Sequence, residues 1–161
     1  MTQPCDNLSV GVIIEQNDKI ALLKRAKSPI AMAPPAGHID DHGSPEQAAV
    51  DEVFEEIGLS ITSDGLVPTV ISNRRVNNQC RRVNGDHHTW WVYRATKFEG
   101  TIAPCADETQ GANWYTQKEL QAFADRTRSL VAANSTQADW QENPGLEETW
   151  LAFFIELGYI K

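Results

Sequence analysis

The sequence predicts an α+β fold of the α/β/α sandwich type, with a central mixed β-sheet flanked by helices. Three observations predict it. Strand and helix patterns are mixed without strict strand–helix–strand alternation, two strand patterns near the N-terminus are joined by a turn signal, and a well-capped helix follows them. The 161 residues, 41% of them hydrophobic, fit one domain with a sizeable core. We expect a single domain over residues 1–161, with its core over about 8–124 and a helical extension over about 125–161.

The first elements are two strands. Residues 8–15 are rich in β-branched side chains, which favour a strand. Residues 16–19 are a turn signal, and residues 20–25 form a second strand pattern, which predicts a hairpin. Three prolines within residues 29–35 then predict an exposed loop.

The next element is a helix beginning at Ser44 and ending at Gly58. Ser44 suits the N-cap, Pro45 suits the first helical position, and Gln47 can complete a capping box. Gly58 suits a left-handed C-terminal cap. An apolar stripe with helical spacing predicts the buried face. Its members are Ala49, Val50, Val53 and Ile57.

The second half of the chain continues the mixed pattern. Further strands are expected at 66–72, 88–98 and 112–115. The polar segment 73–86 predicts a strand end, a loop and the start of the next strand. Helices are expected at 116–124, 127–133 and 146–157, with residues 134–145 irregular. Trp90 and Trp91 point to opposite faces of one strand, so at least one belongs to the core. The C-terminal aromatics are expected to pack onto the domain: Trp140, Trp150, Phe153 and Phe154.

The helix at 45–57 is unusually acidic. It has five acids and no Lys or Arg: Glu46, Asp51, Glu52, Glu55 and Glu56. Glu52, Glu55 and Glu56 have i, i+3 and i+4 spacing and share one helical face. Like charges at this spacing destabilise an exposed helix by a few tenths of a kcal/mol, about as much as opposite charges stabilise it. A bound divalent cation would offset the repulsion.

The segment that contains this helix resembles the Nudix box. Gly37 matches the first glycine of the box, and residues 52–59, Glu-Val-Phe-Glu-Glu-Ile-Gly-Leu, match its end at the right distance. Two positions depart from the pattern. The family's first Glu falls on Gly43 and its Arg falls on Asp51, so both members of a structural pair are absent together.

The resemblance implies a divalent-cation-dependent hydrolase that cleaves a pyrophosphate bond in a nucleoside diphosphate linked to another moiety. It implies Glu52 and Glu56 as the main metal ligands and catalytic residues, with Glu55 as a further ligand. The backbone carbonyl of Ala36 would be another ligand. Mg²⁺, or alternatively Mn²⁺, suits these hard oxygen donors. Glu108 resembles the additional acid of the family, acting as base or ligand, with Asp107 as its competitor.

Three arginines are candidates for contact with substrate phosphates: Arg25, Arg74 and Arg82. Two alternatives to the hydrolase stay open. The departures at Gly43 and Asp51 favour a catalytically impaired nucleotide-binding or regulatory module. An isomerase acting on an isoprenoid diphosphate is disfavoured, because such relatives use a site cysteine and neither Cys80 nor Cys105 has a context that places it there.

Composition limits the remaining possibilities for binding partners and cellular location. The net charge of −8 argues against general nucleic-acid binding and against anionic membrane surfaces. A small nucleotide derivative is the expected partner, and the resemblance also implies a homodimer. The sequence has no transmembrane or signal-peptide pattern, and we expect a cytoplasmic protein with reduced thiols. Cysteine spacing indicates no metal site, and His87 and His88 are expected at the surface or at a sheet edge.

Overall fold

The computed structural model describes residues 3–68 and 71–161. Within them, eight strands form one mixed sheet in the order β3-β2-β1-β7-β5, with β4 also on β1, β6 on β7 and β8 on β2. The strands are β1 (Leu8–Gln16), β2 (Lys19–Arg25), β3 (Met32–Ala33), β4 (Ala36–His38), β5 (Leu66–Pro68), β6 (Arg74–Val76), β7 (His88–Ala95) and β8 (Thr109–Thr116). The helices are α1 (Pro45–Ile57), α2 (Gln117–Ala132), α3 (Gln137–Glu142) and α4 (Glu148–Glu156), with short 3-10 turns at Asp40–His42 and Ser63–Gly65. The pairing of β1 with β7 is parallel, and the other named pairings are antiparallel.

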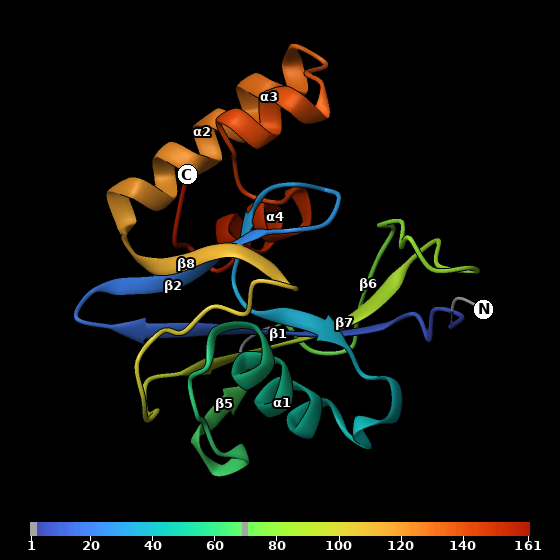
Figure 1. The fold of residues 1–161 in the computed structure, drawn as a ribbon, viewed down its shortest axis with the longest axis vertical. Coiled ribbons are helices and arrows are strands. Elements are labelled where there is room, and N and C mark those ends of the chain that lie inside the picture. The colour runs from blue at the N-terminus through green and yellow to red at the C-terminus, as the bar shows by residue number, and fades with distance from the viewer. Residues whose placement is uncertain (1–2, 69–70) are drawn as a thin grey trace.

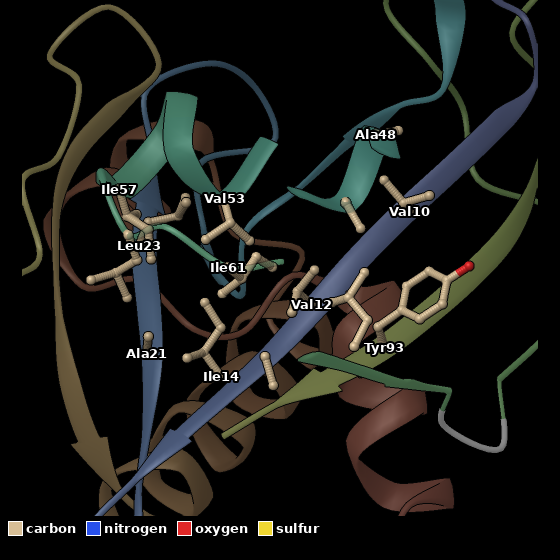
Figure 2. Close-up of a cluster of buried hydrophobic side chains, with 14 of the residues drawn as sticks. Val10, Val12, Ile14, Ala21, Leu23, Ala48, Val53, Ile57, Ile61 and Tyr93 are labelled. Atoms are coloured by element: carbon tan, nitrogen blue, oxygen red, sulfur yellow. The ribbon is translucent and has the colours of Figure 1, made fainter. Parts of the chain in front are cut away.

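The helices lie on both faces of the sheet, as predicted. Figure 1 shows α1 on one side and α2, α3 and α4 on the other. Val12 and Ile14 of β1 belong to the core beneath α1, whereas Ile13 belongs to the core beneath α2 and α4. This alternation follows from the two-residue period of a strand, and burial on both faces explains why β1 is continuously apolar. Figure 2 shows the α1 side of the core.

The N-terminal hairpin is confirmed. Gln16 pairs with Lys19 across the turn. Asn17 and Asp18 both adopt positive φ, which matches the turn geometry that a two-residue hairpin prefers.

The exposed loop predicted over 29–35 is wrong in two respects, because Met32 and Ala33 form β3 against β2 and residues 31–35 are buried. The Met32 N–H also donates to the carbonyl of Gly145 at 2.8 Å, and the Met32 carbonyl accepts from the Glu147 N–H at 2.9 Å. These partners lie far away in sequence, so local composition gave no sign of them.

Helix α1 has the predicted ends. Ser44 Oγ accepts from the Gln47 N–H at 3.1 Å, and Gly58 adopts φ 74°. Only half of the capping box forms, because the Gln47 side chain donates to Asp51 instead. The buried stripe differs by one residue from the prediction, since Ala48 is buried and Val50 is only half-buried.

The region after β8 differs most from the sequence expectations. Helix α2 is continuous where two helices were predicted, because the hydroxyl of Thr127 is buried and donates to the carbonyls of Phe123 and Leu146. The segment 134–145 contains α3, which a capping box between Thr136 and Asp139 begins. β8 extends beyond the predicted 112–115 on both sides because it pairs with β2. Part of the strand predicted over 66–72 lies outside the described residues, and of the rest only β5 is a strand.

Helix α4 packs its aromatic side chains onto the sheet, as expected. Trp150, Phe153 and Phe154 are buried, and the Trp90 ring lies 5.8 Å from that of Trp150. A Cβ atom on Gly11 of β1 would lie 2.3 Å from Trp150 Cζ2. The absence of a side chain at Gly11 therefore allows the Trp150 indole to pack directly against the backbone of β1. In the described residues, no helix has the length and apolarity needed to cross a membrane.

Candidate active site

The loop that precedes α1 touches the acidic face of the helix. β4 is paired with β1, with Gly37 opposite Val10. A Cβ atom on Gly37 would lie 2.0 Å from Oε1 and 2.1 Å from Cδ of Glu52. The carboxylate of Glu52 thus occupies the space that any other residue at position 37 would fill. The match of Gly37 to the first glycine of the Nudix box therefore has a steric reason.

Glu56 lies next to Glu52 and is buried more deeply. Its Oε2 accepts a hydrogen bond of 2.9 Å from the backbone N–H of Ala36. Burial, and then the charge of Glu52, hold the pKa of Glu56 well above its usual range, although the Ala36 hydrogen bond and Arg25 oppose the shift. Burial also raises the pKa of Glu52 to about 7, with the charge of Glu55 as the next cause. Both carboxyls therefore need a further positive charge to be ionised together.

The donor set fits a divalent cation. Among the described residues, no Lys, Arg or His forms an ion pair with Glu52, Glu55 or Glu56. Glu55 is exposed, but its charge still reaches Glu52. Buried carboxylate oxygens next to the Ala36–Gly37 backbone are the hard ligands that Mg²⁺ and Mn²⁺ accept. The structure thus brings together four of the predicted residues: Ala36, Glu52, Glu55 and Glu56.

Glu108 stands at the edge of this cluster. Its carboxylate is about half exposed and forms an ion pair of 3.2 Å with Lys27. Its charge contributes to the raised pKa of both Glu52 and Glu56. Asp107, the competing acid, is exposed and contributes to neither shift.

The three arginines have different surroundings. Arg25, at the end of β2, is half-buried, and its charge lowers the pKa of Glu56, so it lies beside the acidic cluster. Arg82 forms an ion pair of 2.8 Å with Asp40, in the turn between β4 and α1. The structure does not bring Arg74 to the cluster, because both of its terminal nitrogens bond to Glu156 of α4.

Asp51, the residue that departs from the box, has two partners. His42 Nδ1 lies 2.8 Å from Asp51 Oδ2, and the Gln47 side-chain amide donates to Asp51 Oδ1 at 2.8 Å. Partial burial lowers the pKa of His42, but the hydrogen bond and charge of Asp51 outweigh this and raise it. The family's pair has its acid before the helix and its base within the helix. Here the order is reversed, because the base, His42, precedes the helix and the acid, Asp51, lies within it. Sequence reasoning missed His42, although it directly precedes the departing Gly43.

A second cluster was also missed. Ligand-capable atoms of four residues lie within 4.8 Å of one another: Cys5, His38, Cys80 and His88. His88 and Cys5 are buried, so the expectation of a surface position for His88 is wrong. The four residues come from separate segments, and no local spacing motif could have revealed them.

An α/β/α sandwich whose glycine loop closes on a carboxylate-bearing helix is the architecture of a Nudix-type hydrolase. The family model described as NUDIX domain matches residues 6–134, and the chain belongs to that family. No curated protein gives a significant match.

Solved structures agree on the fold. A MutT NUDIX hydrolase from Burkholderia pseudomallei is 25% identical, with a TM-score of 0.56 over 72% of this chain and 85% of its own. A NUDIX-family hydrolase from Clostridium perfringens is 20% identical, with a TM-score of 0.56 over 94% of both chains. An Ap4A hydrolase from C. elegans, solved as a binary complex, is 20% identical, with a TM-score of 0.52 over 78% of this chain and 98% of its own. The latter two, at 20% identity, support the fold alone.

Proposed function

We propose that this protein hydrolyses a pyrophosphate bond in a nucleoside diphosphate linked to another moiety and depends on a divalent cation. The observation that carries the proposal is the placement of the Glu52 and Glu56 carboxylates. Both are packed against the Ala36–Gly37 backbone with no ion pair from a basic side chain of the described chain. Two buried like charges are expensive unless a cation accompanies them.

Each acidic residue has a role in this proposal. Glu52, Glu56 and the carbonyl of Ala36 would hold Mg²⁺ or Mn²⁺, and Glu55, at the exposed edge, would add a ligand. Such an ion neutralises phosphate charge and acidifies a bound water. Gly37 keeps space open for Glu52, and the Ala36 N–H fixes one oxygen of Glu56, which leaves the other free to bind.

Glu108 and Arg25 complete the proposed reaction. Glu108 would accept a proton from the attacking water or add a ligand, and its ion pair of 3.2 Å with Lys27 holds its carboxylate at the cluster's edge. Arg25, beside Glu56, would contact a substrate phosphate. The products would be a nucleoside monophosphate and a phosphorylated leaving group. Arg82 and Arg74 are weaker substrate candidates, because Asp40 and Glu156 already hold their guanidinium groups.

Substrate selection is proposed for the loops around β3. The segments 26–35 and 134–146 lie together, joined by the backbone bonds of Met32 to Gly145 and Glu147. The Lys24 ammonium adds a bond of 2.7 Å to the Gln141 carbonyl. Nucleotide derivatives are the proposed substrate class, in common with the neighbour titled an Ap4A hydrolase.

The second candidate is a nucleotide-binding or regulatory module without catalysis. The departures at Gly43 and Asp51 favour it, whereas the His42–Asp51 pair favours the enzyme by giving Asp51 a partner of its own at 2.8 Å. A cytoplasmic location, a homodimer and one domain over residues 1–161 complete the proposal. The free thiol of Cys105 agrees with a reducing compartment.

A substrate panel tests the proposal. Nucleoside triphosphates, dinucleoside polyphosphates, ADP-sugars and oxidised nucleotides are incubated with and without Mg²⁺, and phosphate is measured after phosphatase coupling. We expect turnover of at least one class with Mg²⁺, and a loss of about 10³-fold or more in Glu56→Gln. Asp64→Asn, at an exposed acid in the 3-10 turn Ser63–Gly65, is the control and should retain wild-type rates. Binding without turnover across the panel would favour the second candidate.

A further inference from the structure

Two thiols and two imidazoles converge at one end of the sheet. Cys5 precedes β1, His38 ends β4, Cys80 lies between β6 and β7, and His88 begins β7. Figure 1 shows the N-terminal segment and the β6–β7 loop on this same side of the molecule. Cys5 Sγ lies 3.4 Å from His38 Nε2 and 3.3 Å from His88 Nε2, and Cys80 Sγ lies 3.4 Å from His38 Nε2.

These separations match the edges of a ligand tetrahedron. With Zn–S bonds of about 2.3 Å and Zn–N bonds of about 2.0 Å, tetrahedral angles place sulfur and nitrogen about 3.5 Å apart. The three sulfur–nitrogen distances fall within about 0.2 Å of this value, and all four donor atoms lie within 4.8 Å of one another.

The surroundings orient the ligands. His88 Nδ1 lies 3.0 Å from the Asn78 side-chain oxygen and 3.2 Å from its carbonyl, so Nδ1 carries the proton and Nε2 faces the cluster with its lone pair. The Asn7 N–H donates to Cys5 Sγ and the Arg82 N–H to Cys80 Sγ, each at 3.3 Å. Such bonds stabilise thiolates.

The backbone around the cysteines is closely fitted. The Cys5 N–H donates to the Val83 carbonyl at 2.9 Å, and the Cys80 N–H donates to the Gly85 carbonyl at 2.7 Å. A Cβ on Gly85 would lie 2.2 Å from Cys80 Cβ and 3.1 Å from Cys5 Sγ. The absence of a side chain at position 85 therefore lets the two cysteine segments meet.

We infer that Cys5, His38, Cys80 and His88 form a structural Zn²⁺ site, distinct from the carboxylate cluster. Four nitrogen and sulfur donors in a tetrahedral arrangement favour Zn²⁺ over Mg²⁺, and a closed set of four protein ligands is typical of structural zinc. On binding, the two thiols release their protons to solvent, and two thiolates balance the charge of the ion. The ion would join the N-terminal segment and the β6–β7 loop to β4.

The inferred zinc site has a consequence for the neighbouring cluster, and this part rests on the proposed function. His38 directly follows Gly37 and Ala36, whose backbone contacts Glu52 and Glu56. Fixing His38 would therefore fix the end of the loop that shapes the carboxylate cluster. His38 is a positioning residue in this account, two residues along the chain from Ala36, whose carbonyl is a proposed Mg²⁺ ligand.

Zinc stoichiometry tests the site without reference to catalysis. Protein produced with zinc in the medium is dialysed against metal-free buffer and analysed by inductively coupled plasma mass spectrometry. We expect one zinc per chain in the wild type, in Cys105→Ser and in Glu56→Gln, and none in Cys80→Ser. Cys105→Ser controls for thiol loss outside the cluster, and Glu56→Gln separates this site from the carboxylates. Wild-type protein that holds no zinc, even after reduction and Zn²⁺ addition, or full zinc in Cys80→Ser, would overturn the inference.

Two measurements keep the test decisive if Cys80→Ser does not fold. Co²⁺ added to reduced metal-free wild type should give the intense ligand-field bands of a tetrahedral site and thiolate charge-transfer bands, and their absence would contradict the ligand set. Thiol titration of the zinc-free, unreduced protein under denaturing conditions shows whether Cys5 and Cys80 are free thiols or form a disulfide. One reactive thiol instead of three, in protein isolated without zinc, would assign the pair to redox chemistry and overturn the inference.

The effect on the carboxylate cluster is measured by Mn²⁺ binding to substrate-free protein, followed by electron paramagnetic resonance. Removal of zinc should weaken Mn²⁺ binding about tenfold, as loss of supporting contacts does at other metal sites. Unchanged Mn²⁺ affinity in zinc-free, folded protein would refute the positioning role while leaving the zinc site intact. Zinc content that is normal in a protein without hydrolase activity would instead count against the proposed function alone.

Discussion

The backbone N–H of Ala36 donates a 2.9 Å hydrogen bond to Oε2 of Glu56 and thereby ties the start of β4 to the last turn of α1. One residue later, Gly37 faces the carboxylate of Glu52. Two consecutive residues thus set the positions of the two most buried acids of the cluster. β4 and α1 therefore form one structural unit, and a change in either element should affect both.

The first prediction concerns Gly37→Ala. The new Cβ would meet Glu52 at 2.0 Å, so the carboxylate must move away from its position. We expect a loss of about 10²-fold in kcat/KM on any accepted substrate, as displacements of about 1 Å commonly cause. Steady-state kinetics at saturating Mg²⁺ measure it. Gly43→Ala is the control, since a Cβ there meets nothing within 4 Å, although its φ of 91° adds strain. A Gly37→Ala enzyme as active as Gly43→Ala would contradict the steric argument.

The second prediction concerns charge in the cluster without metal. Glu52→Gln should stabilise the metal-free protein by about a few tenths of a kcal/mol or more, because it removes repulsion from Glu55 and Glu56. Urea denaturation in EDTA measures the free energy of unfolding. Added Mg²⁺ should stabilise the wild type more than Glu52→Gln. Equal Mg²⁺ stabilisation of the two proteins would exclude Glu52 as a ligand.

The third prediction uses Glu147, which caps α4 by accepting from the Thr149 and Trp150 N–H groups. Burial raises the pKa of Glu147, although Arg25 and the cap bonds oppose it. A carboxyl whose folded pKa is raised adds stability below its unfolded pKa of about 4.3 and loses it as the pH rises through the folded value. Glu147→Gln keeps a cap oxygen and removes this titration. Its melting temperature relative to wild type should therefore be higher at pH 8 than at pH 4.5.

Glu147→Ala provides the contrast to the glutamine variant. It removes the cap and should destabilise the protein by about 1 kcal/mol at both pH values, as cap deletions typically do. The same melting experiments measure it. A glutamine variant that behaves like the alanine variant would show that the charge, and not the acceptor oxygen, matters at this position.

The fourth prediction concerns the His42–Asp51 pair. If the pair supports the acidic helix face, His42→Ala and Asp51→Ala should each lower kcat by up to about tenfold, and the double variant should lower it little further. Residues in direct contact show this non-additivity because either single change already breaks the bond. Additive losses in the double variant would show that the two side chains act independently.

Gly11→Ala is the fifth prediction. A methyl group at 2.3 Å from Trp150 Cζ2 would force the buried indole off its place on β1. We expect destabilisation of about 1–3 kcal/mol, the usual range for overpacking a core. Chemical denaturation followed by tryptophan fluorescence measures it. Gly158→Ala, whose Cβ meets nothing within 4 Å, is a control for glycine replacement, although its φ of 79° adds strain.

Local signals predicted the early elements well. Ser44, Pro45 and Gly58 define α1 because caps act over three or four residues, and the 16–19 turn defines the hairpin. The resemblance to the Nudix box grouped Ala36 with Glu52, Glu55 and Glu56, whereas the close approach of Gly37 to Glu52 was not expected. The features that sequence reasoning missed depend on distant partners. β3 needs Gly145 and Glu147, α2 continues because Thr127 reaches Leu146, and the Cys–His cluster draws on residues from 5 to 88.

The aromatic side chains of α4 lie beyond the segment that the family model matches, which ends at residue 134. They nevertheless fill the space against Gly11 and Trp90 in the middle of the matched sheet. A polypeptide cut at residue 134 would keep α2 on that face but leave the part around Gly11 and Trp90 open to water and prone to self-association. The segment that the family model matches is thus shorter than the segment that is needed to cover both faces of the sheet. A relative that lacks an equivalent of α4 must cover the same strands with something else, or carry bulkier residues where this one has Gly11.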